Sequence, residues 1–190
     1  MNDEIKKAVS ILKTGGIVAY PTDTLFGIGC DITNNQAVKK LIKLKRRDKK
    51  PISIACSNLE MVDKYTDINK EEAEIIQKYL PGPFTFILNK KEMVSELITA
   101  ETEKVGVRIP DYPKILKIIS LLGRPIISTS ANFAGEPNIE NLDQLKFEVD
   151  LKISGECKYK GGSTVVDLRA RKILREGVRF DEIRELFCNI

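Results

Sequence analysis

Segments with the apolar pattern of buried strands alternate along this chain with segments that have the spacing of amphipathic helices. The strand-like segments lie at 17–20, 51–56, 84–88, 105–110, 125–130, 163–168 and 172–175. The helical segments lie at 4–13, from Asn34–Asn35 into the following basic run, and at 58–65, 69–80, 112–123, 141–147 and 180–187. Some strands follow one another through a helix and others through a short turn. The pattern predicts an α/β fold with a mixed parallel and antiparallel, twisted sheet.

The length of 190 residues and a hydrophobic fraction of 42% suit one folded domain, which we expect to span residues 1–190. No apolar run reaches the roughly 18 to 20 residues that a membrane-spanning helix needs. The N-terminal segment MNDEIKKAVSILKTGG contains acidic residues and lacks the apolar region of a signal peptide. We therefore expect a cytoplasmic protein with no membrane contact.

The residue types exclude several kinds of chemistry. The chain has no histidine, which rules out Ser-His and Cys-His nucleophile pairs and imidazole acid-base catalysis. Its four cysteines form no C-x-x-C pair, so we expect free thiols and neither a zinc site nor a disulfide framework. Any catalysis must therefore use charge, hydroxyl groups, backbone amides or a bound metal.

The positive charge is concentrated in one segment. The net charge is +4, whereas residues 39–50 (KKLIKLKRRDKK) alone carry +7, so the rest of the chain is slightly acidic. Adjacent cations repel one another, and a triphosphate or an RNA backbone would relieve that repulsion. A solvated helix face is the third interpretation of this segment.

Polar side chains follow two of the predicted strands. Thr22, Asp23 and Thr24 come after the strand at 17–20, and glycines follow in PTDTLFGIG, where they would let backbone approach a substrate. The strand at 125–130 ends in STSAN, which places Ser128 and Ser130 on one face. The ends of strands in an open α/β sheet are common ligand sites. A turn and locally satisfied serines are the alternatives.

Two arginines are further candidates for anion binding. Arg108 lies within an alternating apolar strand, where it must either face solvent, pair with a structural partner or hold an anion such as a substrate carboxylate. Arg175 follows the segment GGSTVVDL, which is a weaker signal. The chain contains neither a G-x-x-x-x-G-K-[ST] phosphate loop nor a G-x-G-x-x-G fingerprint. Residue patterns alone predict an anion-binding α/β protein.

Taken in order, these segments resemble the YrdC family of threonylcarbamoyl-AMP synthases in its single-domain form. The matching pieces span nearly the whole chain: GGIVAYPTDTLFGIG (15–29), LKRRDKKPISI (44–54), LPGPFTFIL (80–88), VGVRIPDYP (105–113), PIISTSANFAGEP (125–137) and GGSTVVDL with ILREG (161–177). The resemblance implies an open, twisted α/β sandwich around a basic concave cavity. It also implies a nucleotidyltransferase that joins L-threonine, bicarbonate and ATP into threonylcarbamoyl-AMP and diphosphate for tRNA modification.

The resemblance assigns roles to residues of this chain. It implies catalytic roles for Lys45 and Arg47, with Lys45 beside the phosphates. The residues implied to bind ATP are Arg47, Lys50, Asn132 and Arg175. Those implied to bind threonine are Thr22, Thr24, Phe26, Arg108, Ser130 and Ser163. No protein metal site is expected, because magnesium would arrive on ATP.

Two departures and two rival functions stay open. Phe26 and Tyr79 stand where many members have Tyr and Trp, so a hydrogen bond from position 26 is in doubt. The main rival is a non-catalytic module that binds tRNA or double-stranded RNA through the basic segment. The other is a carbamoyl-handling domain like those of hydrogenase maturation factors. The implied partners are tRNA and a downstream tRNA threonylcarbamoyltransferase complex.

Overall fold

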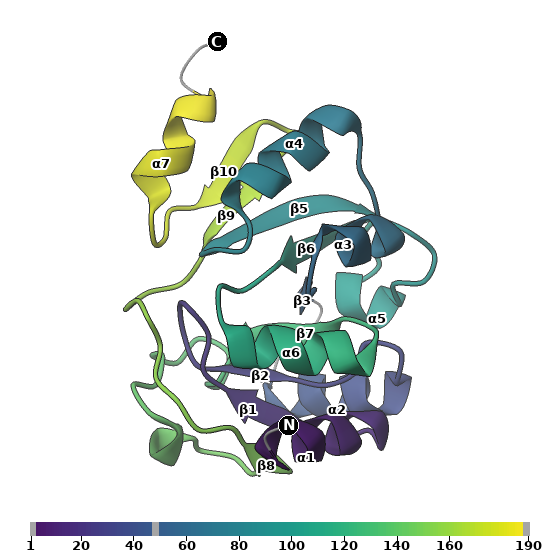
Figure 1. Ribbon diagram of the computed structural model, residues 1–190, viewed down its shortest axis with the longest axis vertical. Coiled ribbons are helices and arrows are strands. Elements are labelled where there is room, and N and C mark those ends of the chain that lie inside the picture. The colour runs from purple at the N-terminus through teal and green to yellow at the C-terminus, as the bar shows by residue number, and fades with distance from the viewer. Residues whose placement is uncertain (1–2, 47–49, 188–190) are drawn as a thin grey trace.

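The computed structural model describes residues 3–46 and 50–187, and the described residues form one sheet of ten strands (Figure 1). The strands are β1 (Val18–Tyr20), β2 (Gly27–Gly29), β3 (Ser53–Ala55), β4 (Thr66–Asp67), β5 (Phe84–Lys90), β6 (Lys104–Arg108), β7 (Ile126–Ser130), β8 (Leu151–Lys152), β9 (Thr164–Asp167) and β10 (Lys172–Arg175). Their order is β10-β9-β5-β6-β3-β7-β2-β1-β8, and β4 pairs with β5. The β1–β8, β3–β6 and β5–β9 pairs are parallel, and the others are antiparallel. The predicted mixed sheet is confirmed.

The helices begin and end largely where the sequence signals predicted. They are α1 (Asp3–Lys13), α2 (Asn35–Leu44), α3 (Leu59–Tyr65), α4 (Lys70–Tyr79), α5 (Glu96–Thr99), α6 (Pro113–Leu122) and α7 (Phe180–Arg184), with 3-10 turns η1 (Leu142–Gln144) and η2 (Glu185–Phe187). Asn34 caps α2, because its side chain accepts hydrogen bonds from the amides of Gln36 and Ala37. Gly123 ends α6 with a φ of 74°, in the left-handed region that favours glycine.

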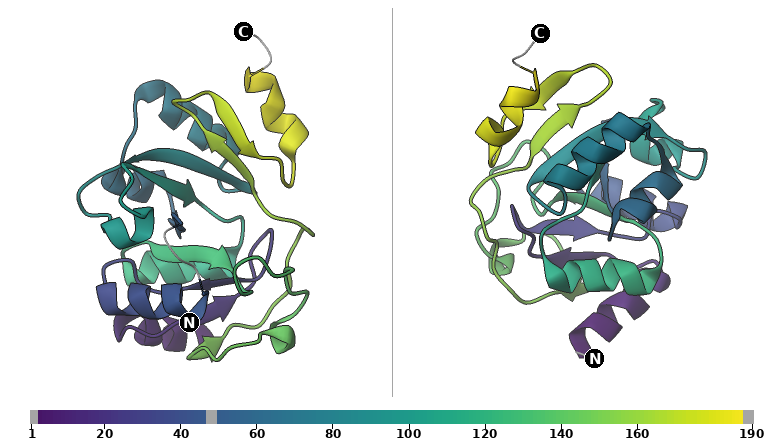
Figure 2. Two further views of the ribbon diagram at one scale, coloured as in Figure 1. Left: turned by 180° about the vertical axis from the view of Figure 1, so that it is seen from behind. Right: turned by 45° about the horizontal axis from the view of Figure 1, so that its top comes forward.

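Helices cover both sides of the sheet. α1 packs against α6, and α2 lies beside α5 on the side turned away from the viewer in Figure 1, as the rear view in Figure 2 shows. None of the helices in the described ranges is long and apolar enough to cross a membrane.

Several elements differ from the sequence prediction. The helix expected at 141–147 is only the 3-10 turn η1. The short elements β2, β4, β8 and α5 were not predicted, because two to four residues carry too little periodicity to identify.

The glycines of PTDTLFGIG have a structural role that the sequence did not indicate. Gly27 and Gly29 form β2, which pairs with β1, and a Cβ on Gly29 would lie 2.3 Å from the carbonyl oxygen of Ile127. The Tyr20 ring packs over both glycines and its hydroxyl donates to that same carbonyl at 3.1 Å. Of these two glycines only Gly27 lines the cavity described below, so a close approach of backbone to a ligand stays a prediction for Gly27.

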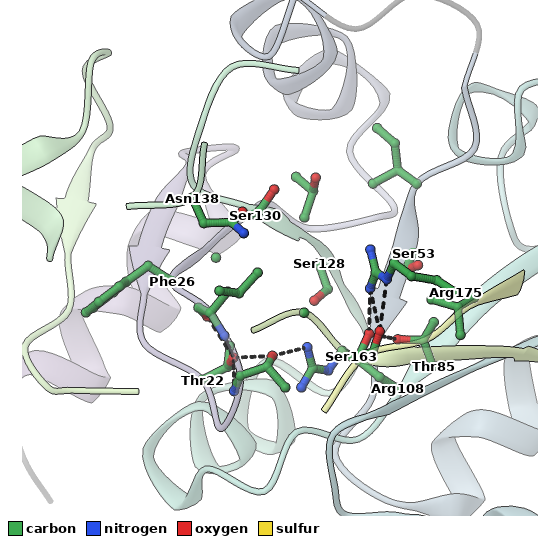
Figure 3. Close-up of a pocket in the computed structure, with 18 of the residues that line it drawn as sticks. Thr22, Phe26, Ser53, Thr85, Arg108, Ser128, Ser130, Asn138, Ser163 and Arg175 are labelled. Atoms are coloured by element: carbon green, nitrogen blue, oxygen red, sulfur yellow. Dashed lines mark hydrogen bonds between the residues drawn. The ribbon is translucent and has the colours of Figure 1, made fainter. Parts of the chain in front are cut away.

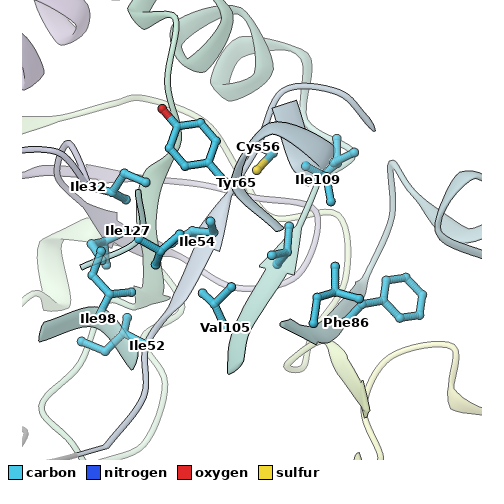
Figure 4. Packing of buried hydrophobic residues seen from close by; sticks show 14 of the residues in the cluster. Ile32, Ile52, Ile54, Cys56, Tyr65, Phe86, Ile98, Val105, Ile109 and Ile127 are labelled. Carbon is cyan, nitrogen blue, oxygen red and sulfur yellow. The ribbon is translucent and has the colours of Figure 1, made fainter. Parts of the chain in front are cut away.

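The main hydrophobic core lies against one face of the sheet (Figure 4). Residues that pair across neighbouring strands supply its centre, among them Ile54, Ile127 and Phe86. Helices α2 to α5 add apolar side chains to this cluster. A second, smaller cluster joins α1 and α6 to the other face through Tyr20, Ala55 and Ile126. Both faces of the central strands are therefore buried over part of their length.

Three of the cysteines lie in described residues and all three are free thiols, as predicted. Cys30 and Cys56 are buried in the main core, and burial raises the pKa of the Cys30 thiol to about 12. Cys188 lies outside the described residues.

The central position of Ile54 predicts a large effect of truncation. Ile54 is fully buried on β3, so Ile54→Ala should lower the free energy of unfolding by about 2 to 5 kcal/mol. Met93 is 49% exposed, and Met93→Ala should change the free energy of unfolding by less than about 0.5 kcal/mol. Urea unfolding followed by circular dichroism measures both, and equal effects of the two substitutions would contradict the assigned core.

Candidate functional site

A cavity of about 330 Å³ opens on the face of the sheet that carries the second cluster (Figure 3). It is lined by the β1–β2 loop, the residues leading into β3, and the ends of β5, β6, β7, β9 and β10. The lining includes hydroxyl groups, one aromatic ring and two guanidinium groups, from Thr22, Thr24, Phe26, Ser53, Thr85, Arg108, Ser128, Ser130, Ser163 and Arg175. The cavity is therefore built from segments far apart in the sequence that meet at the centre of the sheet.

Strand register explains why polar side chains share this face. Ser53 of β3 pairs with Ser128 of β7, while the next pair, Ile54 with Ile127, points into the main core. The same alternation continues across β5, β6 and β9, because side chains on neighbouring strands point to the same face at paired positions. Polar and apolar residues therefore separate onto opposite faces at the cavity.

Arg108 is buried, with a residue exposure of 7% at the end of β6. Its Nη2 donates to Asp23 Oδ1 at 2.5 Å and its Nη1 donates to Thr24 Oγ1 at 3.0 Å. The sequence left open whether Arg108 faces solvent, pairs structurally or holds an anion. The structure excludes the solvent-facing position and supplies Asp23 as a partner, yet Arg108 still lines the cavity.

The loop that supplies these partners is folded by its own hydroxyl groups. Thr22 Oγ1 accepts from the amides of Thr24 and Leu25 at 3.0 and 3.2 Å and donates to the Leu25 carbonyl at 2.7 Å. It also lies 3.1 Å from Thr24 Oγ1, which accepts from Arg108. The predicted turn is present, and it brings Thr22 and Thr24 to the cavity at the same time.

Arg175 and Ser163 form a second polar group at the cavity. The Arg175 Nε and Nη2 donate to the Ser163 carbonyl at 2.9 and 2.8 Å, and Nη2 also donates to Ser163 Oγ at 3.0 Å. Ser163 Oγ in turn lies 2.8 Å from Thr85 Oγ1. Partial desolvation of its guanidinium and, second, the positive charge of Arg108 lower the pKa of Arg175. The two cations therefore act on one another.

A β-bulge directs Arg175 to this position. Ile173 pairs with Val166 and Arg175 pairs with Val165, so Leu174 is the extra residue between two adjacent pairs. Val166 is buried in the main core and Val165 lines the cavity. In a regular strand Ile173 and Arg175, two residues apart, would share a face, and the bulge at Leu174 places them on opposite faces.

Lys45 contacts the S-x-N segment and is not part of the cavity lining. Its ammonium group is buried, with 1% exposure, and donates to the Ser130 carbonyl at 2.6 Å, to Asn132 Oδ1 at 2.9 Å and to the Asn132 carbonyl. Ser130 Oγ donates to Asn132 Oδ1 at 2.6 Å, and Asn132 Nδ2 donates to the Glu136 carbonyl. The structure thus brings Lys45, Ser130 and Asn132 together, although only Ser130 belongs to the cavity lining.

The remaining predicted residues differ in position. The Phe26 side chain is buried and lines the cavity, as a wall should. Lys50 is exposed and directly precedes Pro51, which is part of the lining. Arg47 lies outside the described residues. Its neighbour Arg46 is exposed and stacks over the Phe133 ring at 4.2 Å from the ring centre.

Four polar residues of the cavity lining, outside the segments selected from the sequence, were missed. They are Ser53, Thr85, Asn138 and Glu176. Asp23 was selected only with its neighbours Thr22 and Thr24, and its ion pair with Arg108 was not predicted. A polar residue within an apolar strand needs a partner, which is why Arg108 was selected. Thr85 in FTFIL and Ser53 in PISIAC are polar residues of the same kind and could have been found by this signal. Asn138 and Glu176 belong to segments without strand or helix periodicity and gave no signal.

The assembled cavity suits a small anionic ligand with an aliphatic part. Two guanidinium groups and a row of hydroxyls offer donors for carboxylate or phosphate oxygens. Leu25, Phe26 and Ile52 supply apolar surface in the same lining. Within the described ranges, no group of three or more Cys, Asp or Glu side chains could hold a metal ion.

Comparison with known proteins gives curated relatives over most of the chain. A relative from Methanocaldococcus jannaschii, provisionally named threonylcarbamoyl-AMP synthase, is 37% identical over 188 residues, which cover 93% of this chain and 88% of that protein. The threonylcarbamoyl-AMP synthase of Vibrio vulnificus is 34% identical over 187 residues, which cover 93% of this chain and 100% of that protein.

Solved structures share the fold. P. abyssi Sua5 complexed with L-threonine superposes with a TM-score of 0.89 and 31% identity and covers 98% of this chain. This chain spans 58% of the length of that Sua5 chain. E. coli YciO superposes with a TM-score of 0.83 and 28% identity, covering 92% of this chain and 89% of its own.

The family model described as telomere recombination, for the Sua5, YciO and YrdC proteins, matches residues 10–177. This match confirms the resemblance that the ordered sequence motifs indicated. With a match over most of its length and relatives above 30% identity, the chain belongs to the Sua5–YciO–YrdC family.

Proposed function

We propose that this protein is an L-threonylcarbamoyladenylate synthase, which converts L-threonine, bicarbonate and ATP to threonylcarbamoyl-AMP and diphosphate. The observation that carries the proposal is the cavity, which gathers Thr22, Thr24, Phe26, Arg108, Ser130, Ser163 and Arg175 from distant parts of the chain. These are seven of the residues to which the sequence resemblance gave substrate-binding roles. Relatives named threonylcarbamoyl-AMP synthase match nearly the whole chain and support the same activity.

The reaction joins groups that repel one another. The threonine amine combines with bicarbonate to give a carbamate and water. A carbamate oxygen then attacks the α-phosphorus of ATP, and the bond from this phosphorus to diphosphate breaks. Since the nucleophile and the triphosphate are both anionic, the protein has to neutralise charge and fix the approach. In our proposal Arg108 holds the threonine carboxylate and Arg175 approaches the nucleotide.

Lys45 has a different role in this proposal from the one the sequence suggested. Its ammonium group is buried against Ser130 and Asn132, so we propose that it fixes the end of β7, where Ser130 faces the substrate. Direct contact of Lys45 with phosphate would require those hydrogen bonds to break. Arg47 and Lys50 stay predicted nucleotide-binding residues.

Magnesium enters this proposal with the nucleotide. Glu176 is the one carboxylate among the described lining residues, which is too few for a cation site built by the protein alone. A magnesium ion bridging phosphate oxygens would neutralise part of the triphosphate charge. Bicarbonate as substrate, tRNA contact, a downstream threonylcarbamoyl-transfer complex and a cytoplasmic location stay predictions.

The first prediction concerns the product. Pure protein incubated with L-threonine, isotopically labelled bicarbonate and Mg-ATP should form a labelled threonylcarbamoyl-adenylate together with diphosphate, and mass spectrometry detects both. The signal should disappear when threonine is omitted. Salt-sensitive RNA binding without any labelled adenylate would instead favour the non-catalytic RNA-binding module.

The second prediction tests the cation placed by the bulge. Arg175→Met should lower kcat/KM for adenylate formation by about a hundredfold or more, since it removes a charged donor from the cavity. Arg171, in the turn before β10 and outside the lining, is the matched control, and Arg171→Met should retain activity within about twofold. Similar activities of the two variants would exclude a role for Arg175.

The third prediction addresses a residue outside the described ranges. Arg47→Ala should lose most adenylate formation while its circular dichroism spectrum and unfolding midpoint stay those of the wild type, because phosphate neutralisation depends on this side chain. Unchanged product yield would remove Arg47 from the mechanism.

A further inference from the structure

Asp23 is the partner of Arg108 and is itself completely buried. It does not line the cavity, whereas Arg108 does. The 2.5 Å contact between Asp23 Oδ1 and Arg108 Nη2 is a charge-assisted hydrogen bond beneath the cavity floor. Its carboxylate therefore lies outside the lining and contacts a residue, Arg108, that belongs to it.

The pair is not arranged as a plain structural salt bridge. A guanidinium and a carboxylate usually form two parallel hydrogen bonds, whereas here a single oxygen of Asp23 meets a single nitrogen. Arg108 Nε and Asp23 Oδ2 are both buried, and neither has a hydrogen-bond partner in the part of the chain that the structure describes. Arg108 thus lines the cavity while one of its donors, the buried Nε, is not used by any described neighbour.

The surroundings hold Arg108 in this orientation. Arg108 Nη1 donates to Thr24 Oγ1, and Thr24 is itself held by the turn that Thr22 forms. The Asp23 carbonyl accepts from the Tyr159 amide at 2.8 Å, which ties the loop to the connection that precedes β9. Adjacent residues of one turn, Asp23 and Thr24, therefore restrain the two terminal nitrogens of the guanidinium and leave Nε unpaired among the described residues.

We propose that Asp23 is a positioning residue that fixes and neutralises Arg108, so that this arginine binds the carboxylate of the amino-acid substrate instead of the phosphates of the nucleotide. The inference rests on the proposed function, because it concerns which substrate group Arg108 binds. It adds a residue that does not line the cavity and explains why a carboxylate is buried directly beneath an anion-binding cation.

In this proposal a carboxylate and a triphosphate compete for the two arginines of one cavity. Arg108 and Arg175 line the same space, and a triphosphate carries several negative charges where an amino-acid carboxylate carries one. An Arg108 without a compensating carboxylate would be drawn toward the larger negative charge. With Asp23 in place the pair is neutral overall, and its directional N–H groups select a ligand by geometry more than by charge.

The test compares Michaelis constants for the two substrates. Asp23→Asn keeps the size and one oxygen acceptor and removes the negative charge. We expect the KM for L-threonine to rise by about tenfold or more, while the KM for ATP stays within twofold of the wild type or falls. A threonine KM that rises by less than fivefold, or an equal rise in both constants, overturns the positioning role.

Asp31→Asn is the matched control. Asp31 is equally buried and accepts from Arg124 Nε at 2.6 Å, away from the cavity lining. This variant should lose stability, because buried Asp31 accepts from Thr33 as well as from the partly exposed Arg124, yet keep both KM values within twofold. A purely structural role for Asp23 predicts that the two variants behave alike, which would overturn the proposal.

Two further variants keep the test decisive. In an Arg108→Met background, Asp23→Asn should change the threonine KM by no more than twofold, since its effect acts through Arg108; effects that multiply overturn the proposal. If Asp23→Asn does not fold, Asp23→Glu keeps the charge but moves the carboxylate relative to Arg108 Nη2 and should raise the threonine KM with little change for ATP; an unchanged threonine KM or an equal rise in both constants overturns the proposal. A wild-type enzyme that forms no adenylate overturns the proposed function and this inference together, whereas unchanged constants in an active enzyme overturn this inference alone.

Discussion

Strand register decides which side chains of this sheet enter the core and which face the cavity. The pairing of Ser53 with Ser128 places both hydroxyl groups on the cavity side, and the adjacent pair of Ile54 with Ile127 fills the core. A slip of one residue would exchange these sets and bury hydroxyls while exposing isoleucines. The cost of that exchange stabilises the register, so the apolar face that holds the fold together also positions the polar face.

The bulge in β10 is the exception that this register allows. The alternation of KILR predicts that Ile173 and Arg175 point to the same side, which would require either a buried cation or an exposed isoleucine. Inserting Leu174 between the two paired positions satisfies both side chains: Ile173 packs on the core and Arg175 reaches the cavity. Leu174 itself is 52% exposed, which is consistent with its position as the unpaired residue of the bulge.

The sequence predicted the fold where the periodic signal was long and the site where polar residues interrupted an apolar pattern. The strand ends at Thr22–Thr24 and Ser128–Ser130 and the buried Arg108 were found in this way. The pairing of β1 with β2 was not predicted from the sequence. Gly27 and Gly29 suggest a flexible loop until the Tyr20 ring that packs over them is known.

Contacts across long sequence separations were equally beyond reach of local patterns. Asp23 and Arg108 lie 85 residues apart, and Lys45 reaches Asn132 over 87 residues. Family resemblance grouped Lys45, Ser130 and Asn132, which the structure brings together, but it could not tell that Lys45 is buried against the other two and outside the cavity lining. Burial and hydrogen-bond partners supply that distinction, because an ammonium group with three oxygen partners is already satisfied.

The two arginines of the cavity differ in how their charge is balanced. Arg108 is neutralised by a buried carboxylate, whereas Arg175 donates to a carbonyl and a hydroxyl and has no carboxylate at salt-bridge distance among the described residues. Its positive charge therefore stays available to a ligand, and the lowered pKa of Arg175 reflects both partial desolvation and the neighbouring cation. A polyanion gains most from the uncompensated arginine, and a monoanion is best held by the compensated one, where geometry outweighs net charge. In our proposal this difference directs the threonine carboxylate to Arg108 and the nucleotide phosphates to Arg175.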